Sequence, residues 1–354
     1  MGERLVDVVQ TRAEADALAV PPLAILDPLE EALPGAGTIE MERIGEGHSN
    51  VTFLIRRGAD EWIMRRPPRP PYPARAHDVL REHRIMDSLA PTPVRVPKMI
   101  LASDDESLIG APFFLMEKLD GLVVHREVPA ALDAESDRMG MVDELVDGLA
   151  ELHRVDPTLV GLDNLGRVEG FLERQVSRWY DRWQQNQTRE VTEVDELAAE
   201  LERSRPQSAD VAIVHGDYML NNVMLAPRSP ARLLAILDWE LATVGDPLTD
   251  VGWLTGAYVE PDDPEDGVLT AVAPITREHG FPSREYVAER YAEQSGRSLA
   301  DLSWYQAHAL WKIAILLEGS YRRYVAGVAD DPFYATLEKG VPDLARQAAG
   351  LLDG

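Results

Sequence analysis

The stretch DVAIVHGDYMLNNVMLAPRSPARLLAILDWE, residues 210–240, decides the fold of this chain. It contains four consecutive apolar residues, 211–214, and a short apolar run beside a glycine is typical of a buried strand. The run leads directly into His215-Gly216-Asp217. We therefore expect an exposed loop at the end of a strand to present the carboxylate of Asp217.

Two more apolar runs follow this loop and predict an antiparallel hairpin. They are residues 223–225 and 232–237, and a proline-rich turn separates them. Asn222 precedes the first run and Asp238 follows the second, each eight residues from Pro230. The hairpin would therefore close with both side chains at its open end.

These polar side chains have a chemical meaning together. An amide oxygen and a carboxylate beside a second carboxylate form an oxygen-only site of the kind that Mg²⁺ prefers. An aspartate near such a site suits phosphoryl transfer, because it accepts a hydrogen bond from the attacking hydroxyl and, as a base, its proton. We expect Asp217 to be catalytic and Asn222 and Asp238 to bind metal. The alternative is a polar turn that only solvates itself.

The same residues resemble a known family. The pattern H-G-D-x-x-x-x-N at 215–222, followed by Asp238 in Ile-Leu-Asp-Trp-Glu, is similar to the aminoglycoside phosphotransferase and choline kinase branch of the protein-kinase-like fold. The segment GDPLTDVGWL, residues 245–254, is also similar to that family. The resemblance implies a bilobal α+β fold with a small β-rich N-lobe, one helix in that lobe, and a larger helical C-lobe.

The pattern along the chain suggests where the lobes begin and end. Residues 39–64 alternate in the manner of strands, and the segment after residue 121 has mostly helical periodicity. We expect a helical lead-in over 1–38, a nucleotide-binding N-lobe over 39–120, and a C-lobe over 121–354. The C-lobe would hold the catalytic loop, the metal site and a helical acceptor-binding region.

The resemblance also implies a loop that covers the nucleotide phosphates. The segment IGEGHSNVTFLI occupies the place of the family's phosphate-covering hairpin, and its candidate binding residues are Gly45, Gly47, Ser49 and Asn50. A Gly-x-Gly pattern is weak evidence by itself. A tight hairpin turn without a ligand is the alternative interpretation.

Further nucleotide contacts follow from the same resemblance. Glu82 occupies the place of the helix-borne glutamate that orients the nucleotide-binding cation. The family usually carries that cation as a lysine on the third strand, but the first lysine here is Lys98, and Arg65 is the matching position. A guanidinium binds phosphate in a geometry different from that of an ammonium. Backbone groups near Glu117 and Leu119 would meet adenine.

Three polar residues near the catalytic stretch are expected to be structural. We expect His215 to support the loop through hydrogen bonds, as it does in the related pattern. Asp246 and Asp250 precede or begin a helical segment, and a cap is the favoured role for both. The aromatic residues that recur at helical spacing near 171–183 and 304–324 are interpreted as core.

The expected activity is an ATP- and Mg²⁺-dependent transfer of the γ-phosphate to a hydroxyl group of a small molecule. The string Met-Arg-Arg-Pro-Pro, residues 64–68, resembles kinase-like domains associated with acyl-CoA dehydrogenases. The acceptor stays open between an amino sugar and a hydroxyacyl or lipid metabolite, and so does the choice of ATP or GTP. A nucleotide-binding pseudokinase or regulatory module without turnover is the alternative, because the usual lysine is missing.

The composition excludes other classes. The 354 residues include 35 Lys+Arg and 61 Asp+Glu, a formal net charge of −26. This surplus repels phosphate backbones and anionic lipids, so we expect no nucleic-acid or membrane partner. With no cysteine, the chain has no disulfide framework, thiolate nucleophile or Cys-ligated metal. Without an apolar leader or spanning segment we expect a cytoplasmic protein, and the oligomeric state stays open.

Overall fold

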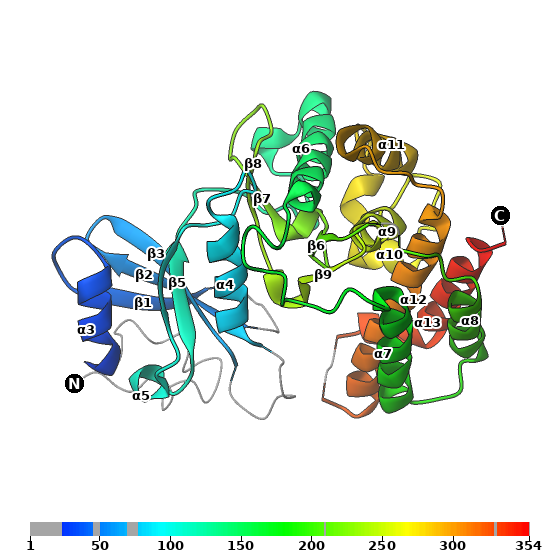
Figure 1. The fold of residues 1–354 in the computed structure, drawn as a ribbon, viewed down its shortest axis with the longest axis horizontal. Helices are drawn as coiled ribbons and strands as arrows, with labels where there is room; N and C mark the ends of the chain where they lie inside the picture. Colours follow the sequence, from blue (N-terminus) through cyan, green and yellow to red (C-terminus); the bar gives the residue numbers. More distant parts are fainter. Residues whose placement is uncertain (1–22, 45–49, 69–76, 209, 329–330, 354) are drawn as a thin grey trace. The chain divides into compact units, whose positions relative to one another are not determined.

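The computed structural model describes residues 23–44, 50–68, 77–208, 210–328 and 331–353 (Figure 1). The chain divides into two compact units. Unit 1 comprises Met1–Asp120 together with Asp238–Glu240, and unit 2 comprises Gly121–Leu237 and Leu241–Gly354. The segment 210–240 therefore contributes to both units, because residues 238–240 are grouped with unit 1 while the hairpin before them belongs to unit 2.

Unit 1 is built on a five-stranded antiparallel sheet with strand order β1-β2-β3-β5-β4 (Figure 1). Its strands are β1 (Ile39–Ile44), β2 (Val51–Arg57), β3 (Asp60–Arg66), β4 (Met99–Ser103) and β5 (Phe113–Glu117). The turn between β2 and β3 contains only Gly58 and Ala59, and Gly58 adopts a φ of 64°. A tight hairpin needs this left-handed conformation, which costs glycine little.

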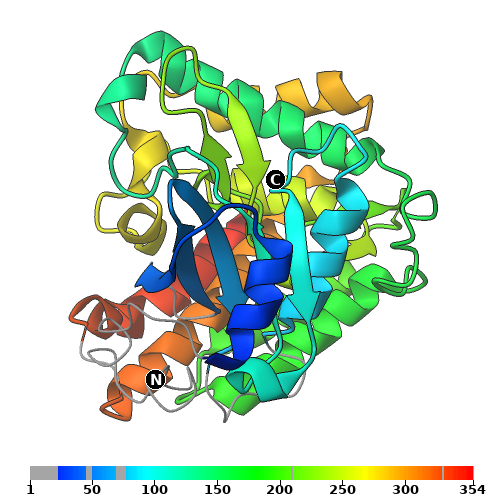
Figure 2. The same cartoon turned by 90° about the vertical axis from the view of Figure 1, so that its left-hand side faces the viewer.

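Three helices accompany the sheet: α3 (Leu23–Ala32), α4 (Val79–Leu89) and α5 (Glu106–Ile109). α3 lies across one face of the sheet, as Figure 2 shows, and its Ile25 and Leu29 join a core with Phe53 and Phe113. α4 packs on the opposite face, where His83 contacts the ring of Phe114. The alternation of the strands thus supplies a separate apolar surface to each helix.

The sequence predicted most of unit 1. β1, β2 and β3 lie within the alternating segment 39–64 apart from the last residues of β3, and α4 is a helix that carries Glu82, as the resemblance implied. β4 was not predicted. Every residue of β4 is half-buried, so this edge strand lacks the alternation by which strands are recognised.

Unit 2 contains two small antiparallel sheets. β6 (Ala212–Val214) pairs with β9 (Thr243–Gly245), and β7 (Val223–Leu225) pairs with β8 (Leu233–Ile236). The second pair is the hairpin expected from the apolar runs around Pro230. β9 was not predicted, because three residues are too few to give a period.

The rest of unit 2 is helical. Its α-helices are α6 (Glu135–Arg154), α7 (Phe171–Asn186), α8 (Thr192–Arg203), α9 (Leu248–Gly256), α10 (Val268–Val272), α11 (Arg284–Ser295), α12 (Leu302–Val325) and α13 (Phe333–Gly350). Short 3-10 turns lie at Ala130–Leu132, Leu220–Asn222 and Pro274–Arg277, and a fourth, Trp239–Leu241, crosses the boundary of the units. Together with the sheet of unit 1, these elements confirm the expected α+β class.

α12 lies at the centre of the unit 2 core. Trp304, Tyr305 and Trp311 are buried there, so these members of the aromatic stripe are core residues, as interpreted from their spacing. α9 approaches α12 closely at Gly252, where an added Cβ would lie 2.5 Å from backbone atoms of Tyr305. Within the described ranges, no helix is long and apolar enough to cross a membrane.

Candidate functional site

The loop after β6 presents Asp217, and Asp250 of α9 holds that loop in place. The backbone N–H groups of His215 and Gly216 each donate to the Asp250 carboxylate at 2.7 Å. Gly216 has a φ of 87°, and a Cβ there would lie 2.7 Å from the carbonyl oxygen of Leu241. A glycine is therefore required both by the backbone conformation and by the space available.

Asp250 is buried and has a further partner on α6. The ring Nε2 of His153 lies 3.1 Å from its carboxylate, and the ring Nδ1 lies 2.7 Å from the hydroxyl of Tyr291 on α11. Burial opposes ionisation of Asp250, but its hydrogen bonds to His153 and Gly216 lower its pKa below the usual value. Burial also lowers the pKa of His153. A neutral imidazole therefore joins an ionised Asp250 to the helical core.

His215 supports the loop through hydrogen bonds, as expected. Its Nδ1 accepts from the backbone N–H of Asp217 at 3.3 Å, and its Nε2 donates to the carbonyl oxygen of Leu237 at 2.8 Å. The imidazole thus connects the catalytic loop to the end of the β7–β8 hairpin. It is fully buried, which suits a structural role and not a direct role in chemistry.

Asn222 contacts Asp217 directly. The side-chain amide of Asn222 donates to the backbone oxygen of Asp217 at 2.7 Å and to its Oδ2 at 2.9 Å. Both contacts use the amide nitrogen, so the side-chain oxygen of Asn222 takes no part in the contact with Asp217. Within the described part of unit 2 this oxygen has no hydrogen-bond partner. It is a hard oxygen donor of the type that Mg²⁺ binds.

The hairpin register links Asn222 to Asp238 along the chain. Leu237 donates its N–H to the carbonyl oxygen of Asn222 at 2.8 Å, and Asp238 is the next residue. Asp238 has a φ of 60°, which is uncommon for a residue other than glycine. Strained conformations of this kind concentrate at functional sites. An amide oxygen and a carboxylate fit Mg²⁺, which usually takes one or two protein ligands and completes its shell with phosphates and water.

Within the described residues, no group of three His, Cys, Asp or Glu side chains forms a metal site.

Unit 1 brings Arg65, Glu82 and Asn50 together, and it adds Glu240. A guanidinium nitrogen of Arg65 on β3 forms an ion pair with Glu82 on α4, and another lies 3.9 Å from Glu240. The Asn50 amide donates to Glu240 at 2.8 Å and to Glu82 at 3.5 Å. The backbone oxygen of Glu240 accepts from Arg81 at 3.2 Å. Arg65 is thus held on the strand position expected for the nucleotide-binding cation.

Glu82 is almost fully buried, and burial raises its pKa to about 7. Arg65 opposes this rise, while the negative charges of Asp238 and Glu240 add to it. Three carboxylates and one guanidinium therefore interact in this part of unit 1.

Of the remaining residues expected to bind the nucleotide, only Glu117 and Leu119 are among the described residues. Gly45, Gly47 and Ser49 lie outside the described residues. Glu117 ends β5, and its backbone N–H donates to the carbonyl oxygen of Lys98 at 2.9 Å. The backbone of Leu119 has no hydrogen-bond partner among the residues described.

Sequence reasoning missed two residues of these clusters. Asp250 was expected to cap a helix, but it binds the loop that carries Asp217. The similarity of the segment GDPLTDVGWL to the family singled out the region of Asp250, but it did not show which groups Asp250 contacts. Glu240 follows Asp238 by two residues and was not proposed as a site residue, because its contacts with Asn50 and Arg65 join positions far apart in the chain.

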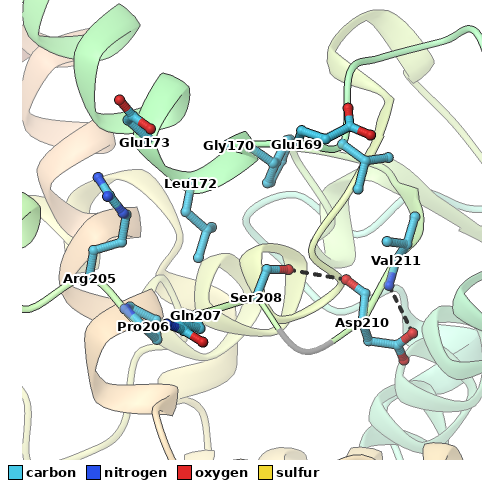
Figure 3. A pocket seen from close by; sticks show the side chains of 12 residues that line it. Glu169, Gly170, Leu172, Glu173, Arg205, Pro206, Gln207, Ser208, Asp210 and Val211 are labelled. Atoms are coloured by element: carbon cyan, nitrogen blue, oxygen red, sulfur yellow. Dashed lines mark hydrogen bonds between the residues drawn. The ribbon is translucent and has the colours of Figure 1, made fainter.

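Two of the pockets in the described part of unit 2 bear on the segment 210–240. Figure 3 shows a pocket lined by residues 168–173 and 205–208 with Asp210 and Val211, at the end of β6 opposite to the loop of Asp217. It contains none of the predicted site residues. A second, mainly apolar pocket is lined by Met219, Leu220 and Asn221, directly after Asp217. Side chains from α6, α9 and α10 complete it.

Comparison with known proteins identifies the family. Residues 40–275 match the model of the phosphotransferase enzyme family. The acyl-CoA dehydrogenase family member 11 of Rattus norvegicus is 30% identical over 308 residues, which cover 84% of this chain. This chain spans only 39% of the length of that relative. The match agrees with the resemblance of residues 64–68 to domains associated with acyl-CoA dehydrogenases.

Solved structures give the fold. A protein from Ralstonia eutropha, provisionally assigned as an aminoglycoside phosphotransferase, has a TM-score of 0.78 at 30% identity, covering 93% of this chain and 97% of its own. A spectinomycin phosphotransferase in complex with ADP and spectinomycin has a TM-score of 0.58 at 11% identity, covering 92% and 97%. The second shares the fold alone. Because the family model covers most of the chain and the Ralstonia structure nearly all of it, the chain belongs to the phosphotransferase enzyme family and has its protein-kinase-like fold.

Proposed function

We propose that this protein is an ATP- and Mg²⁺-dependent kinase that phosphorylates a hydroxyl group of a small molecule. Family membership gives the phosphotransferase reaction class. The observation that carries the finer proposal is the contact of Asn222 with Asp217, which fixes a carboxylate and an amide oxygen on one loop. These are the parts that phosphoryl transfer requires.

Asp217 would act on the acceptor hydroxyl. Its carboxylate accepts a hydrogen bond from the hydroxyl and takes the proton as the acceptor oxygen bonds to the γ-phosphorus. The bond from that phosphorus to the β–γ bridging oxygen breaks, so ADP leaves and a phosphate ester remains. A neighbouring Asn222 that donates to Oδ2 keeps the carboxylate oriented for this transfer.

Asn222 and Asp238 would hold Mg²⁺, which neutralises charge on the triphosphate. Arg65 would bind phosphate oxygens, and its ion pair with Glu82 supports this role because it fixes the guanidinium in advance. The 45–50 segment would cover the phosphates. We assign adenine contacts to the backbone near Glu117 and Leu119.

The lobes take their roles from these assignments. Residues 39–120 would bind the nucleotide, after a lead-in over 1–38, and residues 121–354 would carry the catalytic loop, the metal site and the acceptor region. The acceptor is a hydroxylated small molecule, either an amino sugar or a hydroxyacyl or lipid metabolite. The assignment of the Ralstonia neighbour as an aminoglycoside phosphotransferase favours the first, and the acyl-CoA dehydrogenase name of the rat relative favours the second. We place the reaction in the cytoplasm, without a nucleic-acid or membrane partner.

The test is phosphate transfer from labelled ATP to a panel of aminoglycosides, hydroxyacyl thioesters, amino alcohols and sugars, with and without Mg²⁺. We expect one acceptor class to be labelled only with Mg²⁺. Asp217→Asn should lower the rate on the order of 10² to 10⁴-fold, the range for a lost general base. Its affinity for Mg²⁺–ATP should stay close to that of the wild type.

A nucleotide titration separates this proposal from its alternative. Mg²⁺–ATP binding with no labelling of any acceptor would support a nucleotide-binding module without turnover. Absence of ATP and GTP binding would contradict both. The ion pair of Arg65 with Glu82 favours the kinase, because it reproduces with arginine the arrangement that the missing lysine would form.

A further inference from the structure

Two buried nitrogen atoms without a hydrogen-bond partner within the described ranges lie beside the buried Lys312 in unit 2. Trp253 Nε1 on α9 and His308 Nε2 on α12 are buried without an acceptor or donor. Lys312 lies one turn after His308 on α12, is 9% exposed, and has no carboxylate or other hydrogen-bond partner among the described residues. Buried polar groups are nearly always paired, so such a cluster requires an explanation.

Aromatic rings surround the Lys312 ammonium. Its Nζ lies 4.6 Å from the ring centroid of Trp253 and 5.1 Å from that of Trp179 on α7. The other lysines of the chain, Lys98, Lys118 and Lys339, are exposed. Burial lowers the pKa of Lys312 to about 8, so the ammonium is largely charged at neutral pH. A charge in this setting is costly unless something compensates for it.

The negative charges that act on Lys312 already have other partners. Asp217 and Asp250 are the carboxylates whose charge acts on Lys312. Asp250 accepts from two backbone N–H groups and contacts His153, and Asp217 accepts from Asn222. Neither is hydrogen-bonded to Lys312. Trp253, whose ring lies against the ammonium, is on the same helix as Asp250, and Asp250 holds the loop that carries Asp217.

We propose that Lys312, with Trp253 and His308, binds an oxyanion, a carboxylate or a phosphate, on the acceptor molecule. This inference rests on the proposed function only in naming the ligand as the acceptor. The ammonium and the indole N–H are donors without acceptors, and an oxyanion supplies acceptor oxygens. The half-buried ring of Trp179 adds an apolar wall for the carbon skeleton beside that group.

The subsite has a consequence for selectivity. A cationic acceptor would bring like charge next to Lys312, and such a juxtaposition opposes binding. The net charge of −26 favours cations in general, but this one residue reverses the preference at the acceptor position. Lys312 therefore selects a hydroxyl compound with a negative group over an amino sugar.

The test measures binding of simple probes, so it needs no turnover. Inorganic phosphate, succinate and kanamycin are titrated at constant ionic strength and pH 7, and the tryptophan fluorescence of the full chain is recorded. We expect phosphate or succinate to change the emission, because Trp179 and Trp253 flank the site. If phosphate binds more tightly, the oxyanion on the acceptor is a phosphate group, and if succinate binds more tightly, it is a carboxylate. Kanamycin should bind at least tenfold more weakly than that probe.

Variants assign the signal to the subsite. Lys312→Met should weaken binding of the anionic probe about tenfold or more, the value for a lost hydrogen bond to a charged group. Lys339→Met is the matched control, since Lys339 is exposed on α13 and pairs with Asp343; it should bind as the wild type does. Trp253→Phe keeps the ring and removes the indole N–H, and a few-fold loss is expected.

The outcomes are separable from those of the proposed function. Equal anion affinity in Lys312→Met and Lys339→Met, or tighter binding of kanamycin than of either anion by the wild type, would overturn the subsite. Mg²⁺–ATP affinity is measured on the same samples and should not change in Lys312→Met. If no variant binds ATP, the kinase proposal fails, while the phosphate and succinate titrations still decide the oxyanion site.

Discussion

Arg65 in unit 1 is a partly buried cation and Lys312 in unit 2 a buried one, and their surroundings differ. Arg65 forms an ion pair with Glu82 and lies near Glu240. Lys312 contacts two indole rings and has no hydrogen-bonded carboxylate among the residues described. The first cation is held in a fixed position before any ligand arrives. The second keeps its hydrogen-bonding capacity, and the comparison teaches that burial alone does not define the role of a charge.

The comparison also separates two kinds of recognition. A guanidinium already paired with carboxylates can bind a phosphate group without large rearrangement. This suits a ligand that does not change from one acceptor to another. An ammonium without a hydrogen-bond partner among the residues described gains most from the ligand itself, which suits discrimination between acceptors. Substitutions at Arg65, at Lys312 and at the partners of the two sites, Glu82 and Asp250, test this difference.

The largest effect is expected for Asp250→Ala. This change removes the acceptor for the N–H groups of His215 and Gly216 and the partner of His153. Loss of such a buried network costs about 3–5 kcal/mol of unfolding free energy. Urea denaturation measures it. Asp210→Ala serves as a control in the same unit, because Asp210 is exposed; a similar loss in both variants would contradict the role of Asp250.

Lys312→Met should stabilise the protein at neutral pH. A lysine pKa lowered from 10.5 to about 8 costs on the order of 3 kcal/mol of stability, and the lost cation–π contacts offset about 1. We expect a gain of about 2 kcal/mol by urea denaturation. A decrease in stability would show that the ammonium is a structural element.

The same variant predicts a change in pH dependence. Between pH 8 and 10.5 the unfolded wild type still binds the Lys312 proton that the folded state has released. Stability of the wild type should therefore rise with pH in this window. In Lys312→Met this contribution should be absent. If the unfolding free energy of the variant rises with pH as steeply as that of the wild type, the charge of Lys312 is not buried.

Arg65→Met should weaken Mg²⁺–ATP binding about tenfold or more, since a charge-assisted contact is lost. Arg65→Lys should recover part of the affinity, because an ammonium keeps the charge but not the fork. Calorimetric titration of each variant gives the values. Wild-type affinity in Arg65→Met would mean that Arg65 does not replace the lysine of related kinases.

The smallest effect is expected from the titration of Glu82. Burial raises the pKa of this carboxyl to about 7, so it takes up a proton as the pH falls through 7 and loses its attraction for Arg65. Nucleotide affinity should therefore fall a few-fold between pH 8 and 6. Glu82→Gln should show only the titration of the nucleotide's own phosphates, and identical profiles for both proteins would exclude this effect.

Local patterns in the sequence predicted much of the fold and of the site. The hairpin around Pro230 follows from two apolar runs and a turn, and β7 and β8 pair as those runs indicate. Glu82 lies at helical spacing from Val79 and Met86, so its burial on the apolar face of α4 also follows from the period. Asn222 and Asp217 are five residues apart, and a short loop explains their contact.

Contacts between distant segments could not be predicted in the same way. Lys312 interrupts an apolar run, which indicates an unusual position, but its indole neighbours come from residues 179 and 253. Glu240 reaches Asn50 across 190 positions of sequence. Such contacts depend on how helices and strands pack, and neither periodicity nor spacing encodes them in one sequence.

The position of Asp250 has a consequence for communication within unit 2. Asp250 and Trp253 lie three residues apart on α9, so one turn of helix carries both the anchor of the catalytic loop and a wall of the proposed oxyanion subsite. Gly252, between them, fixes α9 against α12. A small shift of this turn upon acceptor binding would reach the amides of His215 and Gly216 directly. Through this turn of α9, binding of the acceptor at the proposed subsite would affect the position of Asp217.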